Sequence, residues 1–334
     1  MNSTSYDAIL IQSFGGPEGP EDVMPFLRNV TRGRNIPDER LIVVAHHYDL
    51  FGGVSPINEL NRKMIVSLKE LLAKEGPNLP VYWGNRNWKP YLKDTLEEMH
   101  RDGVRNAISF ATAAYSSYSS CRQYLEDIEK ASAELGDKAP RIDKIRPFYA
   151  HPLFIEANVC KLRDAIAATK SDNFALAFSA HSIPIAMADG CEYKNELLEA
   201  SRRVAEAVGH PAFDLVFQSR SGPPTQAWLE PDVCDYLRDV KARGATEVVI
   251  HPIGFVTDHM EVVYDLDTEA KQLAEELGLH LLRAGTASSH PLFIKMIREL
   301  VLEQMSGAKP DSCVPGCCPS GRPVISQGGG QREA

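Results

Sequence analysis

One histidine and a row of carboxylates in the second half of the chain have the residue types needed for proton and metal chemistry. His181 follows an apolar run, and Pro184 prevents a helix from starting at once, so we expect the imidazole on a short loop at a strand end. Glu261, Asp265 and Glu269 recur every four residues after another apolar run. At about 100° per residue, a helix would place these three carboxylates on one slowly drifting face. A neutral imidazole beside a carboxylate can bind a divalent first-row metal and can exchange protons near neutral pH.

Each of these features also has a purely structural explanation. A lone histidine at a strand end is more often a packed loop residue than a catalyst. Asp258 and Glu261, three residues apart, match a capping box at the start of a helix. Like charges four residues apart on a helix, however, repel by roughly a few tenths of a kcal/mol per pair. A row of three carboxylates is therefore mildly destabilising unless it faces solvent or handles cations or protons.

The thiols near the end of the chain form a second candidate site. Cys313, Cys317 and Cys318 crowd into six residues, whereas the other four cysteines are scattered. The N-terminal residues lack the basic and apolar segments of a secretory signal, and in a reducing cytosol clustered thiols bind metal more often than they form disulfides. Zinc and iron–sulfur clusters both accept four thiolates, and a tail with inert thiols is the structural alternative. The candidates for a fourth ligand are a histidine, Cys121, Cys160, Cys191 and Cys234.

The first half of the chain contains candidate sites for an anionic ligand. Gly52 and Gly53 precede Ser55 at a predicted helix start, which is typical of a modest anion site at a helix N-terminus. Upstream lies a local basic patch, and guanidinium groups pair with carboxylates in a bidentate way. The alternative for this patch is a solvated loop, and no glycine fingerprint for phosphate binding occurs in the chain. The patch consists of Arg28, Arg32 and Arg34.

Composition is that of an ordinary soluble globular protein. The length of 334 residues predicts two domains, and 43% of the residues are apolar and 24% charged. The formal net charge of −9 argues against a nucleic-acid binder. No apolar run approaches the roughly 20 residues of a membrane span. We therefore expect a cytoplasmic protein with neither a nucleic-acid partner nor a transmembrane segment.

Short β-rich runs alternate with longer amphipathic stretches along the whole chain. Strands are predicted at residues 6–13, 81–84, 106–111 and 142–149 in the first half, and at 173–180, 214–219, 247–255 and 278–284 in the second. Helical periodicity occurs at residues 58–74, 91–101, 119–135, 192–208, 228–243 and 260–277. Strands that alternate with helices in this way form parallel sheets covered on both faces.

A short internal repeat indicates that the two halves are similar. The segment His151-Pro-Leu-Phe-Ile155 recurs as His290-Pro-Leu-Phe-Ile294, and both copies follow a predicted strand and open a predicted helix. The repeat places a boundary near residue 150, with domains at residues 1–150 and 151–310 and a Cys-containing tail at 311–334. A ligand is expected where the C-terminal strand ends of the two halves face each other.

Five segments together resemble the ferrochelatase family, in the family's order and spacing from about residue 6 to residue 305. They are residues 14–17, 48–56, 179–184, 217–229 and 254–261. The Cys-rich extension, and the lack of an apolar membrane lip between Glu21 and Tyr48, look like the actinobacterial type. Members of that type are similar to the coproporphyrin ferrochelatases, which metallate coproporphyrin III before its decarboxylation to protohaem.

The resemblance implies a chelatase-like α/β fold with two Rossmann-like domains, each a parallel sheet flanked by helices, and an active cleft between them. It implies that His181 and Glu261 face each other across the macrocycle as the catalytic pair and contact the Fe²⁺ substrate. His181 would accept a pyrrole proton, and Glu261 would bind or orient the iron. Asp265 and Glu269 would carry protons out or metal in. The sequence leaves open which member of the pair delivers the metal.

The resemblance also implies a bound cluster and a set of porphyrin contacts. A [2Fe–2S] cluster would be held by Cys160, Cys313, Cys317 and Cys318. The porphyrin-binding residues that it implies are Phe14, Arg32, Arg34, Ser55 and Tyr124. Arg32 and Arg34 take the carboxylate clamp because His47 stands where a bacterial pattern of the family has an arginine.

The activity implied by the resemblance is the insertion of Fe²⁺ into coproporphyrin III, with release of two protons, in haem biosynthesis. Transient contact with neighbouring haem-pathway enzymes is expected alongside it. Two enzyme alternatives are protoporphyrin IX as the substrate, and cobalt or nickel insertion into a corrin precursor. An alternative from another class is a non-catalytic protein that senses haem or iron.

Overall fold

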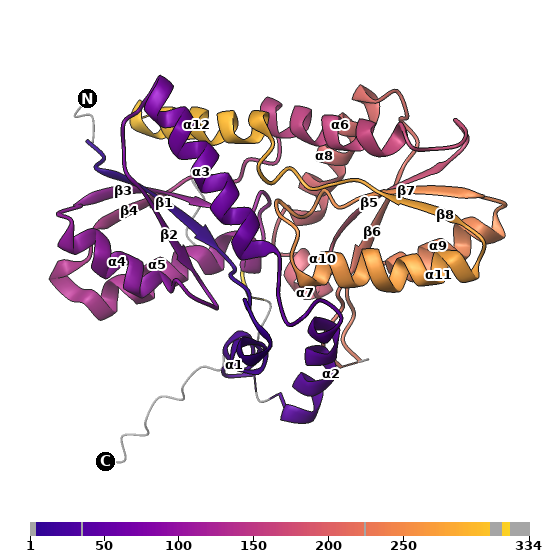
Figure 1. Cartoon of the computed structure of the whole chain (residues 1–334), viewed down its shortest axis with the longest axis horizontal. Helices are drawn as coiled ribbons and strands as arrows, with labels where there is room; N and C mark the ends of the chain where they lie inside the picture. Colours follow the sequence, from indigo (N-terminus) through magenta and orange to yellow (C-terminus); the bar gives the residue numbers. More distant parts are fainter. Residues whose placement is uncertain (1–4, 35, 224, 308–315, 321–334) are drawn as a thin grey trace, which may run out of the picture.

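Two parallel four-stranded sheets organise the chain and lie side by side (Figure 1). The computed structural model describes residues 5–34, 36–223, 225–307 and 316–320. The first sheet has the strand order β2-β1-β3-β4 and the second has β6-β5-β7-β8, so the two halves share one topology and the predicted α/β fold is confirmed. The strands are β1 (Ala8–Ser13), β2 (Val81–Asn85), β3 (Asn106–Ala111), β4 (Arg141–Lys144), β5 (Ala175–His181), β6 (Asp214–Gln218), β7 (Glu247–His251) and β8 (His280–Arg283).

Helices cover both faces of each sheet. Apolar residues of α3 and α12 pack on one face of the first sheet, and those of α4 and α5 pack on the other. In the second sheet α6 and α8 cover one face, and α9 and α11 cover the other. The helices are α1 (Pro20–Val30), α2 (Asp38–Asp49), α3 (Ile57–Glu75), α4 (Leu92–Arg101), α5 (Gln123–Leu135), α6 (Pro152–Ile166), α7 (Ile185–Ala188), α8 (Tyr193–Ala207), α9 (Val233–Ala242), α10 (Met260–Tyr264), α11 (Lys271–Glu276) and α12 (Pro291–Met305). Two π-helical turns, Tyr118–Arg122 and Asp265–Ala270, and a 3₁₀ turn, Gly136–Lys138, complete the regular structure of the described residues.

The last helix of each half packs on the sheet of the other half (Figure 1). α6 follows β4 of the first sheet but contacts α8 and β7, whereas α12 follows β8 of the second sheet but contacts α3 and β3. Both helices begin with the repeated segment, and in both the histidine Nδ1 accepts a hydrogen bond from the N–H two residues on, at 3.2 Å for His151 and 3.3 Å for His290. One core therefore runs through both halves, and the boundary near residue 150 stays a prediction.

Two strands end several residues earlier than the sequence pattern predicted. The run 142–149 yields β4, which ends at Lys144, and the run 247–255 yields β7, which ends at His251. A proline follows closely in each case, Pro147 in the first and Pro252 in the second. Proline has no N–H to donate to a neighbouring strand, so apolar sequence continues there without continuing the ladder.

The loop after β7 lies directly against the end of β5, and a glycine permits this approach. The Gly254 N–H donates to the Ser179 carbonyl at 3.0 Å. A Cβ atom at Gly254 would stand 2.5 Å from the Ala180 Cβ. Since such contacts are far below van der Waals separation, the position requires a residue without a side chain. The close approach brings the ends of β5 and β7 together, and both lead into the candidate site.

The segment around α2 exposes apolar side chains. Ile42 is 46% exposed, Val43 52% and Val44 40%, while Leu41 and Tyr48 are the buried residues of the helix. These side chains are exposed because α2 contacts the rest of the protein along one narrow edge, which leaves the other sides of the helix without cover. The lack of an apolar membrane lip between Glu21 and Tyr48 stays a prediction.

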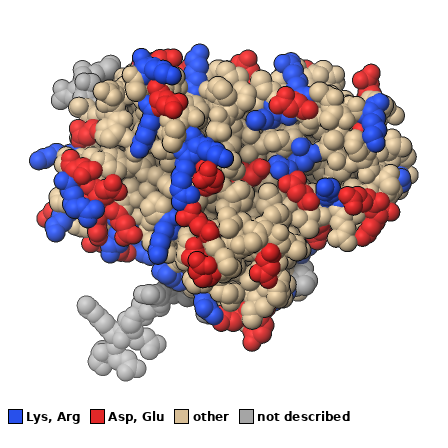
Figure 2. Space-filling model, in the orientation of Figure 1, with Lys and Arg blue, Asp and Glu red and all other residues tan. Residues whose placement is uncertain are grey.

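Charged residues of both signs are interspersed on the face of the molecule shown in Figure 2. Among the helices of the described residues, none combines the length and the apolar composition required to cross a lipid bilayer.

Gly254→Ala should lower the free energy of unfolding by about 1–3 kcal/mol, because overpacking forces the loop away from β5. Thermal denaturation of the purified variant measures the loss. Gly285→Ala is the matched control, since the nearest atom to a Cβ there is Lys161 Cδ at 3.5 Å, an ordinary contact. Equal melting temperatures for the two variants would contradict the close-approach argument.

Candidate active site

His181 and Glu261 meet at the carboxyl edge of the second sheet. His181 is the last residue of β5, and Glu261 lies on α10, which follows the neighbouring strand β7. Carboxyl ends of parallel strands lie at the same edge, so residues distant in sequence converge there. The His181 Nε2 is 3.7 Å from the Glu261 Oε2, with side-chain exposures of 33% and 50%. The pair is thus close enough to act together and open enough to be reached. The expectation that the two side chains face each other across a macrocycle was wrong, because a ring between them needs a contact of about 3.5 Å on each of its faces, and they stand side by side instead.

A carbonyl group fixes which imidazole nitrogen of His181 carries the proton. His181 Nδ1 lies 2.5 Å from the Ser182 carbonyl oxygen, which can only accept. The neutral ring therefore holds its proton on Nδ1. Its lone pair on Nε2 is then directed to the side where Glu261 stands. This tautomer leaves Nε2 free to accept a proton or to bind a metal.

Charge coupling shifts the pKa values of both His181 and Glu261. Burial disfavours the imidazolium of His181, but the Glu261 carboxylate and the Ser182 carbonyl outweigh it and raise the pKa above the ordinary histidine value. Burial likewise opposes ionisation of Glu261, yet His181 and His259 lower the pKa of this carboxyl group to about 2. His259 Nδ1 is 3.8 Å from the same carboxylate oxygen. Glu261 is therefore a permanent anion beside two imidazoles.

Asp265 is the neighbouring carboxylate and has a very different pKa. It accepts hydrogen bonds from Gln218 Nε2, at 3.3 Å, and from the Ser219 hydroxyl. Burial, together with the charge of Glu261, raises the pKa of Asp265 to about 7. Gln218 also donates to the Glu261 carbonyl at 3.0 Å. Asp265 can therefore take up and release a proton near neutral pH.

Glu269 stands beyond Asp265, farther from the histidine. Burial and the nearby Asp232 carboxylate raise the pKa of Glu269, and Arg238 opposes this effect. The three carboxylates thus have graded environments. Glu261 is ionised, Asp265 titrates near pH 7, and Glu269 lies against α9.

The helix that carries these carboxylates is not the continuous α-helix predicted for residues 260–277. A π-helical turn, Asp265–Ala270, interrupts it between α10 and α11. Turns of this kind are rare and are frequently found at functional sites. The predicted capping box is also wrong, because the N-cap of α10 is His259 and no side chain caps it. Asp258 instead pairs with Arg283 at 3.2 Å.

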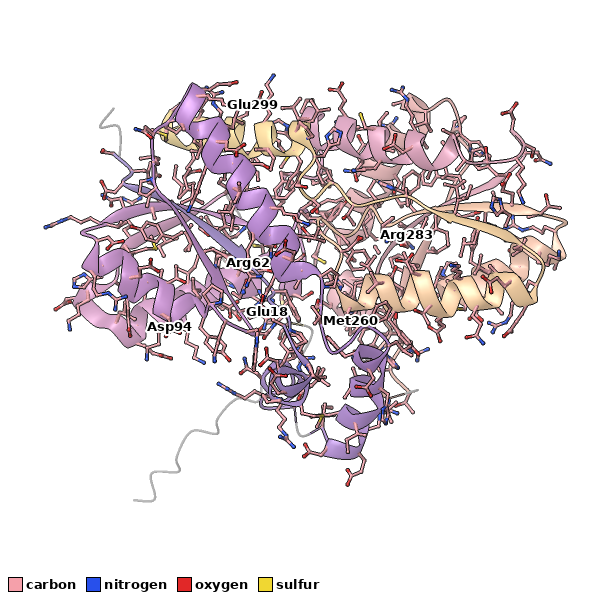
Figure 3. All side chains as sticks on the ribbon, viewed as in Figure 1. Glu18, Arg62, Asp94, Met260, Arg283 and Glu299 are labelled. Carbon is pink, nitrogen blue, oxygen red and sulfur yellow. The ribbon has the colours of Figure 1, made fainter. Side chains whose placement is uncertain are left out.

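Phe14 brings the first half of the chain to the same region. It follows β1 and packs edge-on against Phe26, with ring centroids 6.2 Å apart. Both belong to an apolar cluster that also contains Tyr48 and, from α10, Met260, which Figure 3 labels. Burial and the charge of Glu261 raise the pKa of Tyr48. The first half thereby forms an apolar, desolvated side of the site.

The other predicted porphyrin contacts lie on the first half at varied depth. Arg32 and Arg34 are exposed on the turn after α1, and Arg32 lines a pocket of about 410 Å³. Ser55 is 3% exposed, and Tyr124 is buried beneath the Arg86 guanidinium at 4.0 Å. Within the described part of the chain, no hydrogen bond or ion pair joins Arg32, Ser55 or Tyr124 to the histidine–glutamate pair.

Sequence analysis did not select Gln218, Ser219, His259 or Arg283 as site residues. Gln218 and Ser219 follow β6 in a polar loop, so position at a strand end was an available signal for them. His259 lies within the resembling segment 254–261, which was its signal. Arg283 had no such signal, because its importance depends on partners that only the fold brings near.

The predicted cluster ligands are only partly described. Cys313 lies outside the described residues, and Cys160 lies on α6 with intermediate exposure. The tail is seated near Gly190, since a Cβ there would stand 2.7 Å from Pro319 Cγ. Burial, with the thiols of Cys317, Cys121 and Cys191, raises the pKa of Cys318 to about 12. Over the ranges that the structure describes, no three or more His, Cys, Asp or Glu residues form a metal-binding group.

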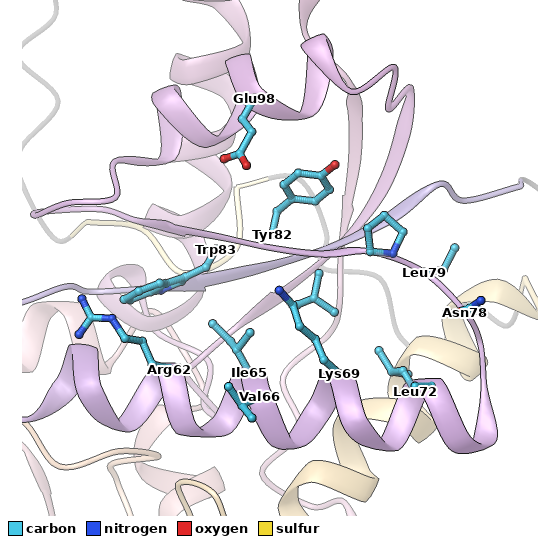
Figure 4. Close-up of a pocket in the computed structure, with 13 residues that line it drawn as sticks. Arg62, Ile65, Val66, Lys69, Leu72, Asn78, Leu79, Tyr82, Trp83 and Glu98 are labelled. Carbon is cyan, nitrogen blue, oxygen red and sulfur yellow. The ribbon is translucent and has the colours of Figure 1, made fainter.

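A groove of about 870 Å³ lies elsewhere, on the outer edge of the first sheet (Figure 4). α3 and the edge strand β2 form its walls, and the Arg62 guanidinium lies 5.5 Å above the Trp83 ring. His181 and Glu261 belong to the other sheet and do not line this groove. The candidate site is therefore defined by its side chains and not by this groove.

Comparison with known proteins gives one consistent family. The family model named ferrochelatase matches residues 6–305. A ferrochelatase of Rhodopirellula baltica is 50% identical over 94% of this chain and 93% of that protein. A coproporphyrin III ferrochelatase of Streptomyces coelicolor is 48% identical over 97% of this chain and 96% of that protein. The corresponding protein of Mycolicibacterium vanbaalenii is 49% identical over 94% of this chain and 95% of that protein.

Solved structures show the same architecture. SirB from Bacillus subtilis with Fe³⁺ has a TM-score of 0.57 and 12% identity, and the match covers 92% of this chain and 100% of that one. The sirohydrochlorin chelatase SirB from Bacillus subtilis subspecies spizizenii, in complex with cobalt, has a TM-score of 0.52 and 11% identity, with coverage of 91% and 97%. At such low identity the likeness shows the fold alone.

Titration of His181 should depend on Glu261. In the native protein the imidazole should keep its proton to a higher pH than the ordinary pKa of about 6.5 allows. In Glu261→Gln the opposing carboxylate is gone while burial remains, so the pKa should fall. Nuclear magnetic resonance of the protein with labelled histidine measures the shift. An unchanged His181 pKa in Glu261→Gln would show that the two groups are not coupled.

Proposed function

The chain belongs to the ferrochelatase family of porphyrin metal chelatases, and we propose that its reaction is the insertion of Fe²⁺ into coproporphyrin III. The products are Fe-coproporphyrin III and two protons, in haem biosynthesis. The observation that carries the proposal is the His181–Glu261 pair, 3.7 Å apart at the carboxyl ends of two adjacent strands. Relatives 48–49% identical to this chain that bear the name coproporphyrin III ferrochelatase support the choice of porphyrin.

Insertion exchanges two pyrrole protons for one iron ion, so the site must hold a metal ligand and a base at one place. Glu261 is the metal ligand, because its pKa of about 2 keeps it ionised and hard anions bind Fe²⁺. His181 is the base. When Fe²⁺ engages Glu261, the charge that favoured the imidazolium is neutralised, and the imidazole loses its proton. The neutral ring then accepts the first pyrrole proton at Nε2, passes it to Asp265, and accepts and passes on the second pyrrole proton in the same way.

Asp265 and Glu269 take the proton away from the centre. Asp265 has a pKa of about 7, which matches a relay that must load and unload in each cycle. The Ser219 hydroxyl and the Gln218 amide hold it in place on the side of β6. Glu269 follows at the end of the π turn. The same two carboxylates offer an entry path for iron.

The ring itself is held by residues of the first half. Phe14 supplies an apolar wall, and Arg32, Arg34, Ser55 and Tyr124 take the propionates. Binding energy from the periphery offsets the strain of bending the macrocycle, which exposes its nitrogen lone pairs. The pocket beside Arg32 does not select between the two porphyrins, because Asp127 pairs with Arg86 and Glu134 pairs with Lys93 there. The choice of coproporphyrin III therefore rests on the named relatives, and protoporphyrin IX is the second candidate.

The [2Fe–2S] cluster belongs to the same proposal, with Cys160, Cys313, Cys317 and Cys318 as ligands. Its support is the seating of Cys318, which is 5% exposed and surrounded by other thiols. The described residues do not complete a ligand set by themselves. The thiols that raise the pKa of Cys318 include Cys121 and Cys191 but not Cys160, the fourth ligand that the resemblance implies. A cytoplasmic location and brief contacts with neighbouring haem-pathway enzymes are proposed with it.

His181→Ala should reduce iron insertion by roughly 10²–10⁴-fold, because a general base is lost. Porphyrin binding, followed by fluorescence quenching, should survive. Turnover is measured anaerobically with coproporphyrin III and with protoporphyrin IX, and His100→Ala, an exposed histidine on α4, is the control. Native protein that binds porphyrin without any metal-dependent absorbance change would instead support the sensor alternative. Faster turnover of protoporphyrin IX would overturn the substrate assignment.

Serine variants test the cluster. Purified native protein should be brown, and Cys317→Ser should remove its visible absorption because a thiolate ligand is lost. Cys160→Ser should do the same, whereas Cys234→Ser, on α9, should not. Bleaching by Cys121→Ser or Cys191→Ser but not by Cys160→Ser would transfer the fourth ligand to that thiol. Native protein without bound iron or acid-labile sulfide would exclude the cluster.

A further inference from the structure

The Arg283 guanidinium pairs with two carboxylates, one on each side of α10, the helix that carries Glu261. Arg283, at the end of β8, donates from Nε and Nη2 to the two carboxylate oxygens of Asp267, both at 2.7 Å. Its Nη1 donates to both oxygens of Asp258 at 3.2 Å. The Arg283 and Asp258 side chains are 19% and 20% exposed, and Asp267 is 36% exposed. Figure 3 labels Arg283 beside the ribbon of this helix.

The two carboxylates bracket the residues that do the chemistry. Asp258 precedes His259, the N-cap of α10, and Asp267 lies in the π turn that follows α10. Glu261 and Asp265 stand between them in sequence. The guanidinium thereby ties both ends of this segment to the last residue of an edge strand.

The segment from Asp258 to Asp267 needs this anchor because its helix, α10, is too short to be stable alone. α10 has five residues and no side-chain cap, and helices of that length are not stable alone. On the other side, Gln218 donates to the Glu261 carbonyl and to Asp265. Without Arg283, the two hydrogen bonds from Gln218, at the end of β6, would be the remaining side-chain anchor of the segment among the described residues. Bidentate arginine–carboxylate pairs fix orientation as well as position, which a lysine cannot do for two acids at once.

We propose that Arg283 is a positioning residue for metal insertion, which acts through Asp258 and Asp267 to hold Glu261 against His181. The inference rests on the proposed function for its readout, but its basis is the geometry of the clamp. Loss of the clamp displaces the carboxylate that meets iron and leaves the porphyrin contacts of the first half in place. The expected signature is a defect in the use of iron without a defect in porphyrin binding.

Arg283→Gln and Arg283→Lys are compared with Arg298→Gln. Arg298 is an equally buried arginine, 19% exposed, that binds the Gly76 and Glu75 carbonyls far from the site. Initial rates are measured at varied Fe²⁺ and at varied porphyrin, with melting temperatures and porphyrin affinity by fluorescence quenching. Arg283→Gln should lower kcat/KM for iron by up to about 10-fold, the lower end of the cost of losing a direct partner of a metal ligand, because Arg283 acts on Glu261 only through Asp258 and Asp267. Arg283→Lys should recover part of this loss.

Two outcomes would overturn the proposal. One is an Arg283→Gln variant with native kinetics for iron and a melting temperature lowered as much as in Arg298→Gln. That result would show that Arg283 has a structural role alone. The other is an equal loss for iron and porphyrin. If Arg283→Gln does not fold, Asp267→Asn keeps the shape of the acceptor, and its iron KM must rise several-fold while its porphyrin KM stays native. A native protein that inserts iron into no porphyrin would instead overturn the proposed function.

Discussion

The charge coupling between His181 and Glu261 is the interaction on which the rest of the site depends. The carboxylate raises the pKa of the imidazole, and the imidazole, with His259, lowers that of the carboxylate. A single arriving cation changes both, because it competes with the imidazolium for the same oxygens. The neighbouring Asp265 has a raised pKa because of burial and because of the charge of Glu261. In the proposed reaction, metal arrival and proton release would thereby be linked through one contact.

Parallel-sheet topology explains why that contact exists. His181 and Glu261 are far apart in the chain, but β5 and β7 are neighbours and point the same way. The close approach at Gly254 brings the loop after β7 onto the end of β5. The first half then adds an apolar side through Phe14 and Tyr48. Each half of the duplicated fold contributes a different property, with charge from one and an apolar enclosure from the other.

Much of the fold could be predicted because its signal is local. Apolar runs placed the strands, and the His-Pro segments marked the two helices that open after them. What failed depends on tertiary partners. Asp258 was interpreted as a cap because Arg283, its actual partner, stands 25 residues away. The π turn has no local signature, and the pKa of Asp265 follows from burial. Proline ended β4 and β7 early, which apolar pattern alone does not register.

The exchange of α6 and α12 between the halves has a consequence for how the protein can be divided. Each helix belongs by sequence to one half and by packing to the other. A gene fragment ending near residue 150 would leave the apolar surface beneath α12 bare, and the complementary fragment would lack a sheet for α12 to cover. Neither fragment is therefore expected to fold on its own, because the two similar halves interlock through the packing of these two helices.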